Sequence, residues 1–158
     1  MPHNIKAFLG HRYNIIPLSK KLSKKYIQLP QGVCMLFLTN SLFDAITGSA
    51  NETSTQSEDG FQLLTHPVKL ILEEYSQNNG KIAYIETDYH GGTGSQSAVL
   101  FENGRKTICK VLDDSSSEPA PANLSEWAIN SVLIALGVRK SRDEFESINL
   151  DDYRSMPD

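Results

Sequence analysis

The stretch Lys81–Leu112 constrains the fold more than any other part of the sequence. Asn103-Gly104 lies between two apolar runs, and this pair favours a type I′ hairpin turn because both of its central residues need positive φ. Earlier in the stretch, Gly91, Gly92 and Gly94 suit a second, glycine-rich turn. The stretch therefore predicts three consecutive antiparallel strands, which together form a meander.

The first of these strands has two different faces, because successive side chains in a strand point to opposite sides of the sheet. One face carries most of the polar groups of the strand: Ile82, Tyr84, Glu86, Asp88 and His90. The other face carries Ala83, Ile85, Thr87 and Tyr89.

A chain of 158 residues with 39% apolar residues suits one domain, residues 1–158, with a single core. We predict the α+β class: an antiparallel sheet that contains the C-terminal-half meander, with two or three packed helices. In the N-terminal third we expect these segments: a strand at Asn4–Leu9 ended by Gly10, irregular chain from His11 to Lys25, a central buried strand at Val33–Leu38, and a helix at Leu42–Thr47 capped by Asn40 or Ser41.

Further along, the composition predicts a surface loop at 49–60, a short strand at Phe61–Leu64 and a helix from Pro67 to the Asn79-Gly80 stop. Asp113–Ala122 is a polar connector, and Asn123–Leu136 is a buried helix that Gly137 and Val138 close. The charged tail keeps four apolar residues, which favour docking on the body: Phe145, Ile148, Leu150 and Tyr153.

Cys34 and Cys109 both lie in predicted buried strands, which favours free thiols in a reducing cytoplasm over a disulfide. The N-terminus lacks the features of a secretory signal, and no apolar run approaches the ~20 residues that span a bilayer. We therefore expect a cytoplasmic protein without a membrane partner.

Charge is distributed unevenly along the chain, whose net charge is −4. Residues 1–34 carry six bases and no acid, whereas residues 113–158 carry ten acids and four bases. Such asymmetry orients a molecule toward a charged partner, or the two ends neutralise each other within the fold. The sequence leaves both interpretations open.

The glycine-rich turn does not match a nucleotide-binding motif. Its third glycine is missing and a strand follows it, so no helix N-terminus is available for a pyrophosphate. We expect Gly91, Gly92, Gly94 and Gln96 to serve the fold, and we predict no cofactor.

Glu86, Asp88 and His90 form the arrangement most suggestive of an enzyme or a metal site, because two carboxylates and an imidazole share a proton or hold a metal. No second histidine or activated nucleophile accompanies them, so we predict no catalytic residue and no resident metal. The same strand face, with Tyr84 and Tyr89, also suits a protein interface built on a few aromatic and acidic contacts.

Three motifs in residues 81–154 resemble a family of small bacterial cytosolic proteins, although His90 stands where that pattern has Phe or Tyr. The residues that carry the resemblance are Tyr89, His90, Gly91, Gly92, Gly94 and Gln96; then Ala128, Ile129, Asn130, Leu136, Gly137 and Val138; then Asp143, Glu144, Phe145, Leu150 and Arg154. The family resembles the immunity proteins of contact-dependent inhibition and polymorphic toxin systems.

The resemblance implies a protein that binds and neutralises the C-terminal domain of a cognate toxin, with no catalysis and no direct contact with nucleic acid. The acidic C-terminal third suits a basic toxin such as a nuclease. Together these considerations predict the following partner-binding residues: Tyr84, Glu86, Asp88, Tyr89, His90, Asp143, Glu144, Asp151 and Asp152. A small enzyme or a ligand- or metal-binding protein, using the Glu86/Asp88/His90 face and the glycine turn, remains the alternative.

Overall fold

The computed structural model describes residues 3–49, 56–90, 93–113 and 127–139. All its strands belong to one antiparallel sheet with the order β2-β3-β1-β4-β5-β6. The strands are β1 His3–His11, β2 Ile27–Gln28, β3 Val33–Phe37, β4 Lys81–His90, β5 Thr93–Glu102 and β6 Arg105–Asp113. The predicted α+β class and the meander β4–β6 are confirmed.

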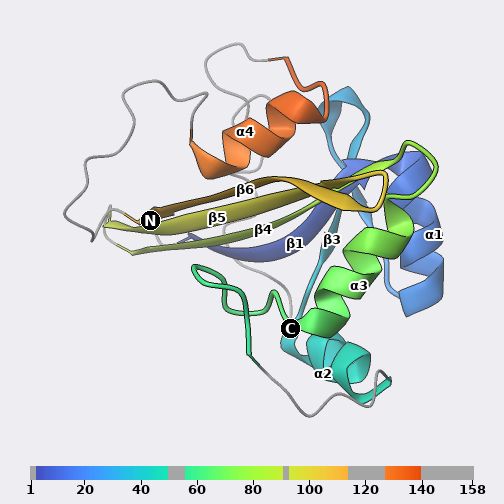
Figure 1. Ribbon diagram of the computed structural model, residues 1–158, viewed down its shortest axis with the longest axis horizontal. Helices are drawn as coiled ribbons and strands as arrows, with labels where there is room; N and C mark the ends of the chain where they lie inside the picture. The colour runs from blue at the N-terminus through green and yellow to red at the C-terminus, as the bar shows by residue number, and fades with distance from the viewer. Residues whose placement is uncertain (1–2, 50–55, 91–92, 114–126, 140–158) are drawn as a thin grey trace.

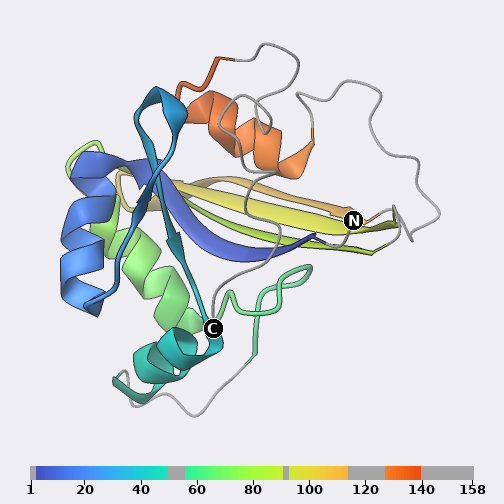
Figure 2. The same ribbon diagram turned by 180° about the vertical axis from the view of Figure 1, so that it is seen from behind.

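Helices cover both faces of the sheet. They are α1 Arg12–Leu22, α2 Asn40–Ser49, α3 His66–Tyr75 and α4 Ala128–Ala135, and a short 3-10 turn spans Pro30–Gly32. Figures 1 and 2 show α4 on one face and α1, α2 and α3 on the other. The described residues thus contain four α-helices, where two or three were predicted.

Strand alternation divides the apolar side chains into two cores, one on each face of the sheet, where the sequence predicted a single core. On the α4 face, Ile5, Ala83, Ile85 and Leu100 pack with apolar side chains of the helix. On the opposite face, the cluster includes Phe8, Ile82, Tyr84, Val99 and Phe101 together with residues of α1, α2 and α3. The strand β3 contributes to both clusters, because its two faces are both covered by protein.

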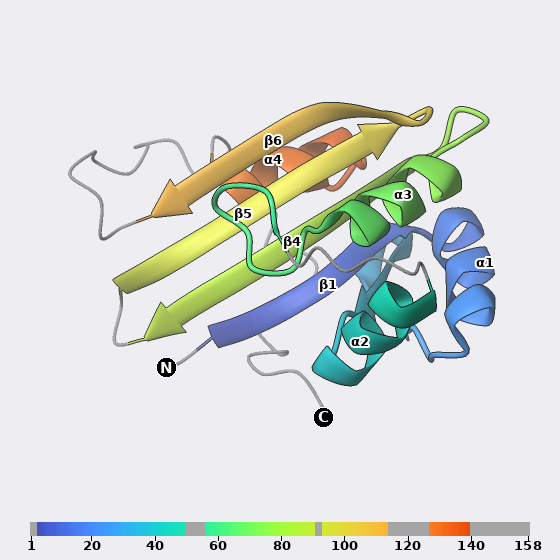
Figure 3. The same ribbon diagram turned by 60° about the horizontal axis from the view of Figure 1, so that its bottom comes forward.

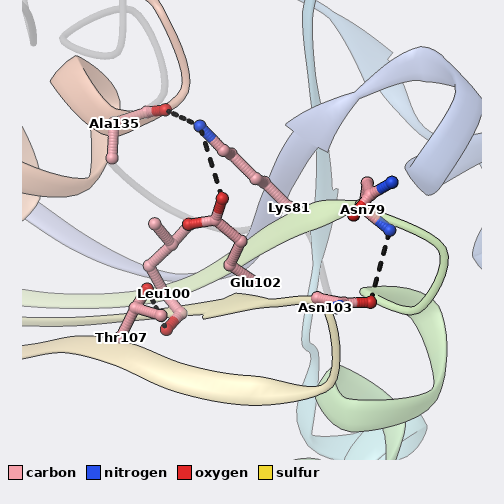
Figure 4. Close-up of polar contacts among 7 residues, drawn as sticks. All are labelled: Asn79, Lys81, Leu100, Glu102, Asn103, Thr107 and Ala135. Atoms are coloured by element: carbon pink, nitrogen blue, oxygen red, sulfur yellow. Dashed lines mark hydrogen bonds and ion pairs between the residues drawn. The ribbon is translucent and has the colours of Figure 1, made fainter.

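The Asn103-Gly104 turn has the predicted geometry, with φ angles of 52° and 80°. The segment that follows α3 holds this turn in place. Asn103 N–H donates to the Gly80 carbonyl at 3.0 Å, and Gly104 N–H donates to Ser76 Oγ at 3.0 Å. Asn79 N–H also lies 3.4 Å from Asn103 Oδ1 (Figure 4). One end of the meander is therefore fixed to α3.

The structure corrects the prediction that residues 11–25 are irregular, because Arg12–Leu22 is a helix. Pro17 and the lysine pairs suggested a break in regular structure. However, Ile15 and Leu18 have helical spacing and are fully buried, while Lys20 and Lys21 point to solvent. Packing of this apolar stripe outweighs the backbone hydrogen bond that Pro17 cannot donate.

Other boundaries also differ from the prediction. The first strand continues through Gly10 to His11, and β3 is next to the edge of the sheet rather than central. The Thr39 hydroxyl, not Asn40 or Ser41, accepts the Leu42 N–H at the start of α2. Residues 61–64 do not form a strand. The predicted connector from residue 114 onward, residues 123–126 and the tail from residue 140 lie outside the described residues.

The C-terminal end of α4 is closed as predicted. Gly137 has φ 91° and donates to the Ile134 carbonyl at 2.9 Å, and Val138 N–H donates to the Leu133 carbonyl at 3.0 Å. Lys81 Nζ adds a bond of 3.1 Å to the Ala135 carbonyl (Figure 4), a favourable place for a cation. Within the described ranges, no helix is both long and apolar enough to cross a membrane.

Candidate functional site

Glu86 is the most heavily engaged polar side chain among the predicted site residues. It lies on β4, on the face covered by α3, and is only 6% exposed. Its carboxylate accepts the Gln62 N–H at 2.6 Å, the Leu63 N–H at 2.9 Å and the Tyr84 hydroxyl at 2.7 Å. A buried carboxylate needs such donors, and charge-assisted bonds of this kind are among the stronger ones in proteins.

Tyr84, whose hydroxyl donates to Glu86, is itself held in place by packing. Its side chain is fully buried, with ring centroids 5.6 Å from Phe8 and 6.2 Å from Phe61. Burial raises the pKa of Tyr84 well above its ordinary value, and the neighbouring charge and hydrogen bond of Glu86 raise it further. The phenol therefore remains protonated and donates to the carboxylate.

Residues 58–64, which we call the covering loop, lie across the sheet at this point (Figure 3). The loop closes on itself through the Glu58 N–H to Leu64 carbonyl bond of 3.0 Å. The Ser97 hydroxyl donates to the Gly60 carbonyl, so β5 also holds it. Gly60 has φ +86°, and a Cβ there would lie 2.4 Å from a methyl of Val111. Only glycine fits this contact without strain.

An ion-pair cluster fixes the start of the covering loop. Glu58 lies 2.5 Å from Lys106 on β6 and 3.7 Å from Lys69 on α3. Partial burial alone would raise the pKa of Glu58, but the hydrogen bond from Lys106 and the charges of both lysines lower it overall. The covering loop thus joins three elements of the fold: α3, the β4–β5 pair and β6.

The remaining predicted residues of the strand face have different positions. Asp88 is half-buried on β4, with Asn4 and Ser95 opposite it on the neighbouring strands. Tyr89 and His90 are the last residues of β4, and their backbones pair with Gly94 and Thr93. Figures 1 and 3 show this end of the sheet projecting beyond the helices.

Burial separates these residues into two groups. Tyr84 and Glu86 lie inside the protein beneath the covering loop, so they do not belong to its outer surface as the prediction of partner contacts required. Asp88 is half-exposed, and the side chains of Tyr89 and His90 lie outside what the structure describes. Asp143, Glu144, Asp151 and Asp152, together with Gly91 and Gly92, lie outside the described residues.

Gln96 performs a structural task on the opposite face. Its side chain is buried, and Oε1 accepts the Ile129 N–H at 2.9 Å at the start of α4. A structural role for this residue agrees with our expectation that it serves the fold. Gly94, expected to shape the turn, lies within β5 and pairs with Tyr89.

Neither cysteine forms a disulfide, but only one of them is buried. Cys34 is buried as predicted, whereas Cys109 is exposed because β6 is an edge strand. Burial raises the pKa of Cys34, and partial burial, with the nearby Glu58 charge, raises that of Cys109. Both thiols therefore stay protonated near neutral pH. Across the described part of the chain, no three His, Cys, Asp or Glu side chains gather as metal ligands.

An apolar groove lies between α1, α2 and α3. The sequence did not indicate it, because α1 was not predicted. Its volume is about 460 Å³. Its lining comes from three helices: Leu18, Lys21, Leu22, Leu42, Ala45, Ile46, Pro67, Leu70, Ile71, Glu74 and Tyr75. Burial, and then the charge of Glu74, raises the pKa of Tyr75 at its edge.

The described residues carry more positive than negative charge. They hold 12 of the 15 basic residues of the chain but only nine of its 19 acidic residues. Most of the acids expected to attract a basic partner therefore lie outside them. Searches of protein-family models, curated proteins and solved structures with this chain found no match.

Proposed function

We propose that this protein is an immunity protein that binds and neutralises a cognate bacterial toxin domain in the cytoplasm, without catalysing a reaction. The proposal rests on the resemblance carried by residues 89–96, 128–138 and 143–154. It also rests on the different roles of two carboxylates on one strand face.

Glu86 and Asp88 are two residues apart on β4, and this difference in role is the observation that carries the proposal. Glu86 is occupied by two backbone donors and a phenol, so its carboxylate holds the fold together instead of meeting a substrate. Asp88 lies further along β4, near the end of that strand, and is half-exposed. The enzyme alternative thereby loses a central group, while Asp88 is the acid of this strand face that reaches the described surface.

A basic toxin domain is the partner that these acids suit. In this proposal the negative surface that meets the toxin consists of Asp88, within the described residues, and of four acids outside them: Asp143, Glu144, Asp151 and Asp152. Opposite charges accelerate association and are screened beyond a Debye length of about 8 Å at physiological ionic strength.

The test is co-expression in bacteria with the toxin domain encoded beside this protein's gene, followed by co-purification. We expect restored growth and a stable complex on a sizing column. Growth arrest despite abundant folded protein, with no complex, would exclude the proposal.

Asp88→Lys tests the proposed surface. The matched control is Asp44→Lys, because Asp44 is an exposed acid on α2. We expect the first substitution to slow association about tenfold at low salt and the control to change it by less than about twofold. Equal effects of the two substitutions would remove Asp88 from the interface.

A further inference from the structure

The two edges of the sheet are built differently. The β2 edge is only two residues long, whereas β6 runs for nine residues. Among the strands that the structure describes, none pairs with the outer side of β6. An edge of this length presents a row of backbone donors and acceptors to an incoming chain.

A bulge separates β6 into two parts. The register shifts at Leu100/Phe101, so that Thr107 is an extra residue on β6 and its hydroxyl lies 3.4 Å from the Leu100 carbonyl (Figure 4). Bulges interrupt pairing and protect an edge. Beyond the bulge, residues 108–113 pair regularly with β5 and form an uninterrupted edge.

Cys109, Lys110 and Val111 of this edge are exposed, whereas Ile108 and Leu112 are half-buried. The charge that β6 carries before Asp113 is positive only. Val111 is 48% exposed on the covering-loop face. Lys106 is committed to Glu58, but Arg105 and Lys110 make no ion pair within the described ranges. These two bases share the α4 face, because they lie opposite Glu102 and Ala98.

We propose that the outer edge of β6 binds an extended acidic segment of a partner protein by strand addition. Backbone pairing along residues 108–113 would supply the affinity, and alternate side chains would supply the specificity. An acidic residue beside Lys110 and an apolar residue beside Val111, on opposite faces, define the sequence pattern that fits.

The positive charges of the β6 edge favour an acidic partner segment over a second copy of the chain. A second copy of the chain would bring the same bases to both sides of the new pair, with no acid between Arg105 and Leu112 to meet them. Like charges opposite each other destabilise a strand pair, whereas opposite charges stabilise it. The inference goes beyond toxin neutralisation, because it requires an acidic strand rather than a basic surface.

The experiment uses the full chain and a short peptide of alternating valine and glutamate, with a valine–lysine peptide for comparison. We expect binding of the glutamate peptide alone, with amide chemical-shift changes concentrated at residues 108–113. Methylating alternate backbone nitrogens of the peptide, on the side that donates, should weaken binding more than about tenfold, because its side chains remain but its donors are lost.

Arg105→Glu/Lys110→Glu should weaken binding of the glutamate peptide about tenfold, since the cross-strand pair at Lys110 becomes repulsive and Arg105, on the other side of the bulge, no longer attracts the acidic peptide. Lys20→Glu/Lys24→Glu changes the net charge equally on exposed residues of another part of the molecule, and should alter binding less than about twofold. Unchanged melting temperatures establish that all variants fold.

Three results would overturn the inference. The first is equal binding of the two peptides, and the second is equal binding of the methylated peptide. The third is a dimer of the free protein in sedimentation that Arg105→Glu/Lys110→Glu dissociates, because the edge would then be occupied by a second copy.

Discussion

On each face of the sheet a buried polar side chain attaches a distant segment of the chain, but the two side chains differ in charge. On one face, buried Glu86 holds the backbone of residues 62 and 63; on the other, buried Gln96 holds the backbone of Ile129. Each side chain attaches a distant segment to the central strands. The Glu86 carboxylate is an anionic group that accepts three hydrogen bonds. The Gln96 amide is neutral and accepts the Ile129 N–H. A charged anchor holds its segment more firmly, but its removal is more costly.

The largest expected effect is therefore at Glu86. Glu86→Gln should lower the free energy of unfolding by about 3 kcal/mol, because an amide cannot satisfy all three donors. Gln96→Met, which also preserves the size of the side chain, should lower it by about 1–2 kcal/mol because one buried N–H loses its acceptor. Denaturant unfolding measures both values. A larger loss for Gln96→Met would reverse the comparison between the faces.

The next effect concerns the fit of the covering loop at Gly60. Gly60→Ala should cost about 2–3 kcal/mol, since it combines a strained φ with a Cβ that collides with Val111. Gly137→Ala is the matched control, because that glycine has a similar φ of +91° and open space around it, and it should cost about 1 kcal/mol. Adding Val111→Ala should recover part of the Gly60→Ala loss. If the two glycine variants unfold alike, the contact with Val111 does not restrict the loop.

Tyr84 should make stability depend on alkaline pH. Its pKa is raised in the folded protein, so its contribution is fully present below the unfolded value near 10 and is lost as the pH rises toward the folded value. We expect stability to fall above about pH 10, by up to about 1.4 kcal/mol per pH unit from this group. Tyr84→Phe should lessen this slope and cost about 1–2 kcal/mol at neutral pH. Unfolding curves at several pH values test this, and an unchanged slope would contradict it.

The smallest effect should come from the ion pair at the edge of the covering loop. Lys106→Ala removes the nearer of the two lysine partners of Glu58, but both side chains are partly solvated, so we expect a loss below about 1 kcal/mol that decreases with added salt. Lys81→Ala is a useful comparison, since Lys81 contacts Glu102 at 3.9 Å and also closes α4. A salt-independent loss at Lys106 would indicate that the loop depends on packing of its aliphatic chain instead.

Local signals in the sequence predicted the meander, the start of α3 and the end of α4 well. The other two helix ends differ from the prediction: α3 ends at Tyr75, before the expected Asn79-Gly80 stop, and α4 begins at Ala128 with Trp127 as its N-cap, while residues 123–126 lie outside the described residues. Asn103-Gly104 determined a turn type, and Gly137 with Val138 determined a helix end, because each depends on a few adjacent residues. Helix α1 was missed because its stability comes from burying Ile15 and Leu18 against β1, β3, β4 and α3, and such tertiary contacts are not encoded in the local sequence. The prediction that Cys109 is buried was wrong. Its exposure follows from its position on an edge strand, and local patterns do not encode strand order.

The role of Glu86 illustrates the same distinction. The sequence placed Glu86 on a strand face between Tyr84 and Asp88, and the structure pairs it with Ser97 across the hairpin. These two polar residues on a buried face signalled a need for hydrogen-bond partners. The partners themselves, the N–H groups of Gln62 and Leu63, were not identifiable because backbone groups have no sequence signature. A strand at 61–64 seemed plausible because Phe61, Leu63 and Leu64 are apolar.

The position of β1 between β3 and β4 has a consequence for how fast the chain folds. Gly10 pairs with Ile82 and His3 with Tyr89, so the first strand to leave the ribosome waits for one of the later strands to complete its pairing. Closing a loop of this length costs about 2 kcal/mol more entropy than closing a ten-residue loop. The meander requires only short loops, and such local contacts form earlier. We expect refolding to be slow, with the β4–β6 hairpins acquiring exchange protection before β1.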